Sequence, residues 1–365
     1  MKEKDNNKSA LNVRGGIPQP PGVNPDLLKR NGNHRRKKIT LDEYVSGILE
    51  GNRTILSQAI TLVESSLPQH YRKGQAIIGK TLPYSAKSVR IGITGAPGAG
   101  KSTFIESFGL HVAGKGKKVA VLAIDPSSER TKGSILGDKT RMERLSNHPD
   151  AFVRPSPASG THGGVARKTR EAIILCEAAG FDTIIIETVG AGQSETAAHS
   201  MVDCFLLLML AGAGDELQGI KRGIIEMADI IAVTKADGSN KLLAEEAAVS
   251  FQNALHLFPA QPSGWKPQVV TCSALQNTGI MEIWNSIEQY MTFTKQTGYF
   301  EMRRRQQTIA GMHDTIIEYL NHSFYNHKKV KLLMPQLEQQ LNDGTLTSYQ
   351  AAISLLSKYF NTGSK

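Results

Sequence analysis

One octapeptide constrains the fold of this chain more than any other feature. It reads Gly95-Ala96-Pro97-Gly98-Ala99-Gly100-Lys101-Ser102 and matches G-x-x-x-x-G-K-[ST] at every fixed position. A run rich in β-branched residues at 89–94 precedes it, and a helical stretch from Thr103 follows. A strand, a glycine-rich loop and a helix in this order are typical of a phosphate-binding loop, in which backbone N–H groups approach phosphate oxygens at a helix N-terminus. The alternative is a glycine-rich turn that binds no ligand.

The side chains of the loop have distinct expected roles. Lys101 is expected to reach the β- and γ-phosphates as a mobile positive charge and so to serve catalysis, and Ser102 to give its hydroxyl to Mg²⁺. Thr103 is expected to bond the α-phosphate. The residues that we expect to bind the nucleotide here are Gly95, Ala96, Pro97, Gly98, Ala99, Gly100, Lys101, Ser102 and Thr103.

The pattern around the loop predicts a doubly wound α/β fold with a mostly parallel sheet. Short apolar runs alternate with helical stretches, and runs of this length flanked by helices fit strands that are buried on both faces of a parallel sheet. The runs lie at 89–94, 119–124, 183–187, 205–210, 230–234 and 269–272. Helical stretches at 103–113 and 168–179 separate some of them.

Four segments follow from the changes in pattern along the chain. Residues 1–38 are rich in Asn, Gly, Pro and Lys, which predicts a disordered or loosely attached basic tail. Helical periodicity predicts a helical N-terminal module over 39–84. A domain built on the phosphate-binding loop is expected over 85–292, and a helical C-terminal arm over 293–365.

Composition bounds the partners and the compartment. The formal charge of +10 would suit nucleic acid or a membrane surface, but the basic runs at 35–38 and 303–305 are interpreted as a solvated tail and a solvated helix face. We therefore expect no nucleic-acid partner. The longest apolar run, 204–211, is far shorter than the roughly 20 residues of a membrane span. Three cysteines without metal-site spacing and a polar N-terminus without a signal peptide predict a cytoplasmic protein.

Carboxylates near the loop are candidates for the metal and for hydrolysis. Glu187 ends the run at 183–187, where a Mg²⁺-coordinating acid is typical, and its length suits a water-bridged contact. Gly190 follows and could give its N–H to the γ-phosphate. Asp125 ends the run at 119–124 and either orients the attacking water or holds Mg²⁺ through a water. Asp138 is a further candidate Mg²⁺ ligand. For Glu187 and Asp125, a solvated acid and a turn cap remain the respective alternatives.

A second motif predicts which base is bound. Thr234-Lys235-Ala236-Asp237 follows an apolar run and is similar to the N-K-x-D guanine motif. The Asp237 carboxylate can accept from guanine N1–H and N2–H₂ together, and adenine lacks these donors. The stem of Lys235 can lie on the purine face. Thr234 stands where Asn is usual, which predicts a less firmly tethered base loop. The alternative is a strand-end acid that caps a turn.

A Ser-Ala turn after the last run fits the same purpose. We expect Ser273, Ala274 and Leu275 to lie at the base, with a backbone N–H donated to guanine O6; the alternative is an ordinary strand-to-helix turn. The expected ligands are therefore GTP or GDP with Mg²⁺.

Six separated blocks in order carry a family resemblance. They lie at 92–103, 125–128, 133–142, 154–160, 187–195 and 213–221. Together they resemble the methylmalonyl-CoA mutase-associated GTPases of the MeaB/ArgK type, over about residues 40–300 and more loosely beyond. The resemblance implies a GTPase domain of the signal-recognition-particle and metal-insertion class, and a homodimer formed through the C-terminal arm. It also places Asp125, Asp138 and Glu187 around Mg²⁺ and the γ-phosphate.

The function that the resemblance implies is a GTP-hydrolysing chaperone. Its partner would be an adenosylcobalamin-dependent acyl-CoA mutase, whose cofactor loading it gates and which it protects. A second hypothesis is an ATP-dependent kinase associated with an arginine/ornithine transport system. A third, a metal-insertion GTPase for nickel enzymes, would need His/Cys clusters, and the sequence has none at ligand spacing.

Overall fold

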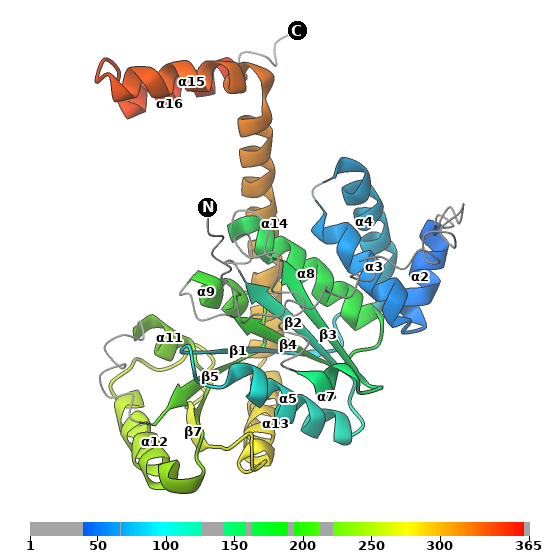
Figure 1. Ribbon diagram of the computed structural model, residues 1–365, viewed down its shortest axis with the longest axis vertical. Coiled ribbons are helices and arrows are strands. Elements are labelled where there is room, and N and C mark those ends of the chain that lie inside the picture. Colours follow the sequence, from blue (N-terminus) through cyan, green and yellow to red (C-terminus); the bar gives the residue numbers. More distant parts are fainter. Residues whose placement is uncertain are drawn as a thin grey trace, which may run out of the picture. The chain divides into compact units, whose positions relative to one another are not determined.

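The predicted doubly wound α/β fold is confirmed. The computed structural model describes residues 39–65, 67–125, 142–157, 162–188, 193–211 and 222–360. Within this part, seven strands form one sheet in the order β3-β2-β4-β1-β5-β6-β7, and every neighbouring pair is parallel (Figure 1). The strands are β1 (Val89–Gly95), β2 (Val119–Asp125), β3 (Ala151–Pro157), β4 (Thr183–Thr188), β5 (Cys204–Leu210), β6 (Ile230–Thr234) and β7 (Gln268–Thr271).

Helices connect these strands, precede them and follow them. In chain order they are α2 (Leu41–Leu49), α3 (Arg53–Glu64), α4 (Pro68–Thr81), α5 (Lys101–Gly114), α7 (Glu143–Ser146), α8 (His162–Ala178), α9 (Gln193–His199), α11 (Arg222–Met227), α12 (Lys241–Leu255), α13 (Ile280–Gln296), α14 (Tyr299–Asn326), α15 (Lys328–Asn342) and α16 (Ser348–Phe360). Two 3-10 turns, Leu82–Tyr84 and Gly238–Asn240, complete the described elements.

Strand β3 is the element that the sequence pattern did not predict. It contains Pro155 and Pro157, and proline inside an apolar run argues against a strand because it cannot donate to the sheet. The structure resolves this conflict by position, since β3 pairs with β2 alone at the end of the sheet. An edge strand tolerates proline where a central strand does not.

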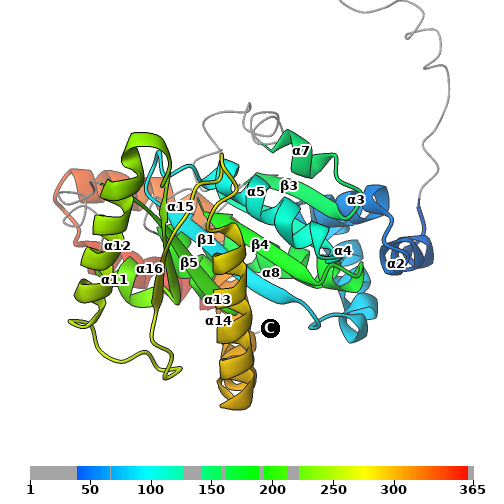
Figure 2. The ribbon, with the colours of Figure 1, turned by 90° about the horizontal axis from the view of Figure 1, so that it is seen from below.

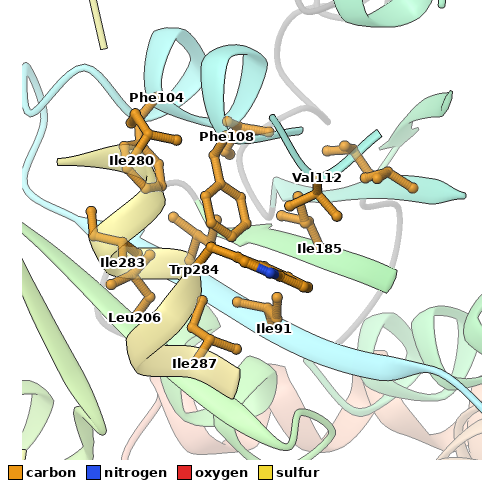
Figure 3. Packing of buried hydrophobic residues seen from close by; sticks show 14 of the residues in the cluster. Ile91, Phe104, Phe108, Val112, Ile185, Leu206, Ile280, Ile283, Trp284 and Ile287 are labelled. Atoms are coloured by element: carbon orange, nitrogen blue, oxygen red, sulfur yellow. The ribbon is translucent and has the colours of Figure 1, made fainter. Parts of the chain in front are cut away.

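The two faces of the sheet are covered by different helices. Helices α5 and α13 cover one face, and α8 and α9 lie on the opposite one (Figures 1 and 2). On the first face, Trp284 of α13 packs against Phe108 of α5 and above Ile91 of β1, as Figure 3 shows. Buried aromatic and aliphatic side chains of this size dominate core energetics, so this cluster fixes α5 beneath the phosphate loop.

The helices outside the sheet are packed on it or on one another. α3 and α4 contact α8, and Arg154 of β3 forms an ion pair with Glu64 of α3 at 2.5 Å. α15 and α16 share a small apolar cluster of their own, centred on Val330 and Leu355. The basic run at 303–305 is only partly solvated: Arg303 is buried and Arg304 half-buried, so the prediction of a solvated helix face is wrong for both.

Candidate functional site

The octapeptide forms the turn between β1 and α5, at the carboxyl end of the central strand. Gly98 and Gly100 adopt left-handed backbone angles, with φ of 85° and 79°, which glycine reaches without strain. Gly95 is required for a different reason: a Cβ there would lie 2.5 Å from the carbonyl oxygen of Leu208 on β5. The sheet and the loop therefore pack so closely that only glycine fits at the start of the turn.

Lys101 folds back over this loop. Its ammonium donates hydrogen bonds to the carbonyl oxygens of Gly95 at 2.7 Å and Ala96 at 3.1 Å. Burial lowers the pKa of Lys101, whereas the carboxylates of Glu187 and Glu195 act to raise it. The positive charge is thus held at the mouth of the loop, as binding the β- and γ-phosphates requires.

Ser102 and Glu187 come together as predicted by their places in the chain. The Ser102 hydroxyl lies 3.3 Å from Glu187 Oε1, because Glu187 is near the carboxyl end of β4, which pairs with β1. Glu187 is buried, with 9% of its surface exposed. A hydroxyl and a carboxylate are the oxygen donors that hard divalent cations prefer. Among the described residues, no group of three or more His, Cys, Asp or Glu side chains is arranged to hold a metal ion.

Three predicted residues are not tested by this geometry. Asp125 is the last residue of β2, and its side chain lies outside the described part of the structure. Asp138 and Gly190 also fall outside the described residues. Their roles stay predictions.

The base loop begins where β6 ends, and it is tied to the phosphate loop. The Thr234 hydroxyl donates to the carbonyl oxygen of Ala99 at 2.8 Å and lies 3.1 Å from that of Met209. A single buried hydroxyl at this position therefore reaches the phosphate loop, and how firmly it tethers the base loop in comparison with Asn stays a prediction. Lys235 follows with a left-handed φ of 57°, a conformation that costs energy in a residue with a side chain.

Asp237 and Ser273 meet although 36 residues separate them in the sequence. Ser273 donates its hydroxyl hydrogen to Asp237 Oδ2 and accepts from the backbone N–H of Gln276 at 3.2 Å. Because the Ser273 hydrogen is used in this way, the Asp237 carboxylate is held as an acceptor. Ala274 lies beside α5, where its carbonyl oxygen accepts from Ser107 at 2.8 Å, and the Leu275 side chain is exposed.

One buried carboxylate at the site was not among the predicted site residues. Glu195, in the first turn of α9, has no exposed surface and accepts from Ser194 at 3.2 Å and Thr94 at 3.5 Å. Thr94 directly precedes the phosphate loop and also accepts from Thr188 of β4 at 2.8 Å. No spacing rule singles out Glu195, because its proximity to Lys101 depends on how α9 packs against β1 and β4.

The family described as "Methylmalonyl Co-A mutase-associated GTPase MeaB" matches residues 56–329. The chain belongs to this family. It is accordingly a GTPase that binds guanine nucleotides, as the loop at residues 95–103 and the Asp237–Ser273 pair lead one to expect.

Individual members and relatives of the family are similar to this chain over most of their length. The GTPase ArgK of Escherichia coli is 47% identical over 290 residues, which cover 79% of this chain and 88% of that protein. The mitochondrial methylmalonic aciduria type A homolog of Mus musculus is 41% identical over 329 residues, which cover 87% of this chain and 79% of that protein. The crystal structure of an LAO/AO transport system kinase superimposes with a TM-score of 0.69 at 36% identity, over 89% of this chain and 98% of that chain.

The helices carry no sign of a membrane span. None of those in the described ranges combines the length and the apolar character that crossing a bilayer requires.

Replacement of the loop lysine tests the phosphate site. We expect Lys101→Ala to lower the rate of GTP hydrolysis by about 100-fold or more, the scale on which removal of one transition-state hydrogen-bond donor acts. Hydrolysis is measured by phosphate release, and the melting temperature should stay near that of the native protein. Lys115→Ala, at the exposed end of α5, is the matched control and should hydrolyse normally. Unchanged turnover in Lys101→Ala would contradict the assignment.

Proposed function

We propose that this GTPase is a chaperone for an adenosylcobalamin-dependent acyl-CoA mutase, with methylmalonyl-CoA mutase as the expected partner. In this role it gates loading of the cofactor and protects the mutase. The observation that carries the proposal is membership of the mutase-associated family over residues 56–329. The name of the mouse relative, which refers to methylmalonic aciduria, supports the same partner.

Mg²⁺ is proposed as the metal of the site. The Ser102 hydroxyl and the Glu187 carboxylate, 3.3 Å apart, fit a cation that is bound by few protein oxygens and completed by water and phosphate oxygens. Asp125 and Asp138 are the further proposed ligands. When bound, Mg²⁺ would neutralise charge on the β- and γ-phosphates. Lys101 would bind the same phosphates, and the Gly190 N–H would contact the γ-phosphate.

Recognition of guanine is proposed for the loops that carry Asp237 and Ser273. The carboxylate accepts from the two adjacent donors of guanine, while the Ser273 hydroxyl keeps it oriented. The Lys235 stem covers the purine face, and a backbone N–H in the turn of Ala274 and Leu275 reaches O6. The Thr234–Ala99 hydrogen bond keeps this base site in register with the phosphate loop.

The second candidate function is an ATP-dependent kinase associated with an arginine/ornithine transport system. One observation favours it, the name of the solved LAO/AO transport system kinase that resembles this chain. The two candidates differ in the base that they need. The Asp237 carboxylate can accept hydrogen bonds from guanine, whereas adenine has no donors at the corresponding positions. The base loop therefore favours the GTPase over the kinase.

Replacement of the Asp237 carboxylate by an amide tests whether the chain is a GTPase or an ATP-dependent kinase. We expect Asp237→Asn to weaken GTP binding by about 100-fold, since two charge-assisted hydrogen bonds are lost, and to improve binding of xanthosine triphosphate, whose O2 accepts from an amide. Kd values are measured by calorimetric titration. Asp343→Asn, on the exposed loop between α15 and α16, is the control and should bind GTP as the native protein does. Native protein that binds ATP as tightly as GTP would favour the kinase.

Binding to a mutase tests the chaperone role directly. Purified methylmalonyl-CoA mutase should be retained by the immobilised native chain, and it should accelerate GTP hydrolysis about tenfold or more, in the direction of partner-stimulated GTPases. An acyl-CoA enzyme that uses no cobalamin is the control. If the mutase neither binds nor alters hydrolysis, the chaperone proposal is wrong even though GTP is hydrolysed.

We propose that the chain forms a homodimer through the exposed apolar face of α14. Ile309, Met312, Ile316 and Leu320 recur at helical spacing and are each about half exposed, at 56%, 53%, 47% and 53%. A stripe of this kind needs a partner surface, and a second copy offers the same stripe. We expect light scattering to give about twice the chain mass of 39.7 kDa. The variant Ile316→Glu should be monomeric, because it places a charge in the apolar stripe. The control variant Leu257→Glu, at an exposed position outside the stripe, should remain dimeric. A native protein that is monomeric would exclude this interface.

A cytoplasmic location is also proposed. The three cysteines are free and buried, which suits a reducing compartment.

A further inference from the structure

Ser107, in the second turn of α5, makes a contact that differs from the usual one of a serine inside a helix. Such a serine commonly donates its hydroxyl hydrogen to the carbonyl oxygen four residues earlier. In α16, for example, Ser354 donates to the carbonyl oxygen of Gln350 at 2.8 Å. Ser107 instead donates to the carbonyl oxygen of Ala274 at 2.8 Å, although 167 residues separate the two in the sequence. The hydroxyl therefore joins α5 to the turn that follows β7.

This turn, residues 273–278, is closed by its own backbone. Ser273 and Thr278 exchange two backbone hydrogen bonds, at 2.9 and 3.1 Å, and form an isolated antiparallel bridge. Within the turn, the N–H of Gln276 donates to the Ser273 hydroxyl at 3.2 Å. Ala274 packs against the buried cluster that includes α5 and α13, whereas residues 275–278 are exposed. The turn is thus a closed loop with an exposed tip, and Ser107 contacts it at the base of that tip.

The turn offers backbone donors that the protein itself does not use. In the part of the chain that the structure describes, the N–H groups of Ala274 and Leu275 have no hydrogen-bond partner. Those of Ser273 and Gln276 are already paired inside the turn. Backbone donors left unpaired by the protein bind water or a ligand. Ala274 and Leu275 therefore carry donors that are available to guanine O6.

The contact with Ser107 fixes the peptide that joins these two residues. A peptide group is planar and trans, so its C=O and its N–H point in opposite directions. Because the carbonyl oxygen of Ala274 is directed at α5, the N–H of Leu275 is directed away from α5. Loss of the Ser107 hydroxyl would allow this peptide to rotate and would change the directions of the donors on either side of it.

The start of the same turn is held by the acid that is proposed to read the base. Ser273 donates to Asp237, and Ala274 follows Ser273 directly. Guanine presents N1–H and O6 side by side on one edge, so the carboxylate and the backbone donor must keep a fixed spacing to bind both. The hydroxyls of Ser273 and Ser107 hold the turn at two successive points and so set this spacing.

Helix α5 is a rigid support for this arrangement. Phe104 and Phe108 are buried on its inner face with their rings stacked at 5.5 Å, and the ring of Phe108 lies 6.0 Å from that of Trp284 on α13 (Figure 3). Lys101 stands in the first turn of this helix and Ser107 in the second. One well-packed helix therefore carries both the lysine of the phosphate loop and the hydroxyl that holds the base turn.

We propose that Ser107 is a positioning residue for guanine recognition. Its hydroxyl holds the peptide between Ala274 and Leu275 so that a backbone N–H of the turn reaches O6. Ser107 acts through the turn and makes no contact with the nucleotide. This proposal rests on the proposed recognition of guanine by Asp237 and its neighbouring turn.

Exchange of one atom in the ligand tests the proposal. The diphosphate of 6-thioguanosine keeps the N1–H and N2–H₂ donors for Asp237 but has sulfur, a weak acceptor, in place of O6. Calorimetric titration gives its Kd and that of GDP for the full-length native and Ser107→Ala proteins. We expect Ser107→Ala to weaken GDP about fivefold, the scale of one neutral hydrogen bond. The thio analogue should weaken less than about twofold, the level of uncoupled groups.

Steady-state hydrolysis separates positioning from a merely structural role. Ser107→Ala should raise the KM for GTP about fivefold and leave kcat unchanged, because binding of O6 is equally strong before and during the reaction. A structural role, in which α5 loosens beneath Lys101, would lower kcat as well. Alanine is a better helix former than serine, so α5 itself should keep its stability, and the melting temperature should stay near the native value.

Two further variants complete the test. Ser107→Thr keeps the hydroxyl and should bind GDP within about twofold of the native protein. Ser250→Ala, which removes an exposed serine hydroxyl from α12, is the matched control and should bind both nucleotides as the native protein does.

The outcomes distinguish this proposal from the proposed function. Unchanged GDP binding in Ser107→Ala, equal weakening of GDP and the thio analogue, or Ser107→Thr behaving as Ser107→Ala each overturns the role of Ser107 and leaves the proposed function standing. A native protein that binds the two nucleotides equally well, or binds neither, shows instead that the O6 contact of the proposed function is wrong.

Discussion

The burial of one ammonium group is the constraint on which the rest of this site depends. Lys101 is half-buried at the start of α5, and a charge that is partly withdrawn from water is tolerated when oxygens interact with it. The carbonyl oxygens of Gly95 and Ala96 accept its hydrogen bonds, and the carboxylates of Glu187 and Glu195 interact with it electrostatically. The sheet order that puts β4 beside β1 brings Glu187 there, and the packing of α9 brings Glu195. A phosphate that binds Lys101 would replace part of this set.

How much of this could be predicted from the sequence depends on whether the relevant signal is local. The phosphate loop, Glu187 and Asp237 all lie at or just after the end of an apolar strand, and this position, together with the two sequence motifs, predicted a role at one site. β3 was not predicted because its prolines contradict strand propensity, and only its position at the edge makes them acceptable. The mutase partner was predicted from the family resemblance alone, because no pattern of residues specifies it.

Contacts between distant segments could not be predicted in this way. Arg303 and Arg304 are withdrawn from solvent because they pair with Asp229 and Asp203, which are distant in the sequence. When these partners are not known, a run of three arginines is interpreted as a solvated helix face. The same holds for Thr234, whose hydroxyl reaches the phosphate loop only because β6 ends level with it. Thr234, which replaces the usual Asn of the guanine motif, thus still donates a hydrogen bond to the phosphate loop.

The prolines of β3 have a consequence for the whole sheet. A strand at the end of a parallel sheet presents a row of backbone groups to which another chain can add, and this is a common route to aggregation. Pro155 and Pro157 pair in register with Ala123 and Asp125 of β2, yet neither has an N–H to offer a further strand. At these two positions β3 therefore lacks a backbone donor that an added strand could use, and the same residues obscured the strand in the sequence.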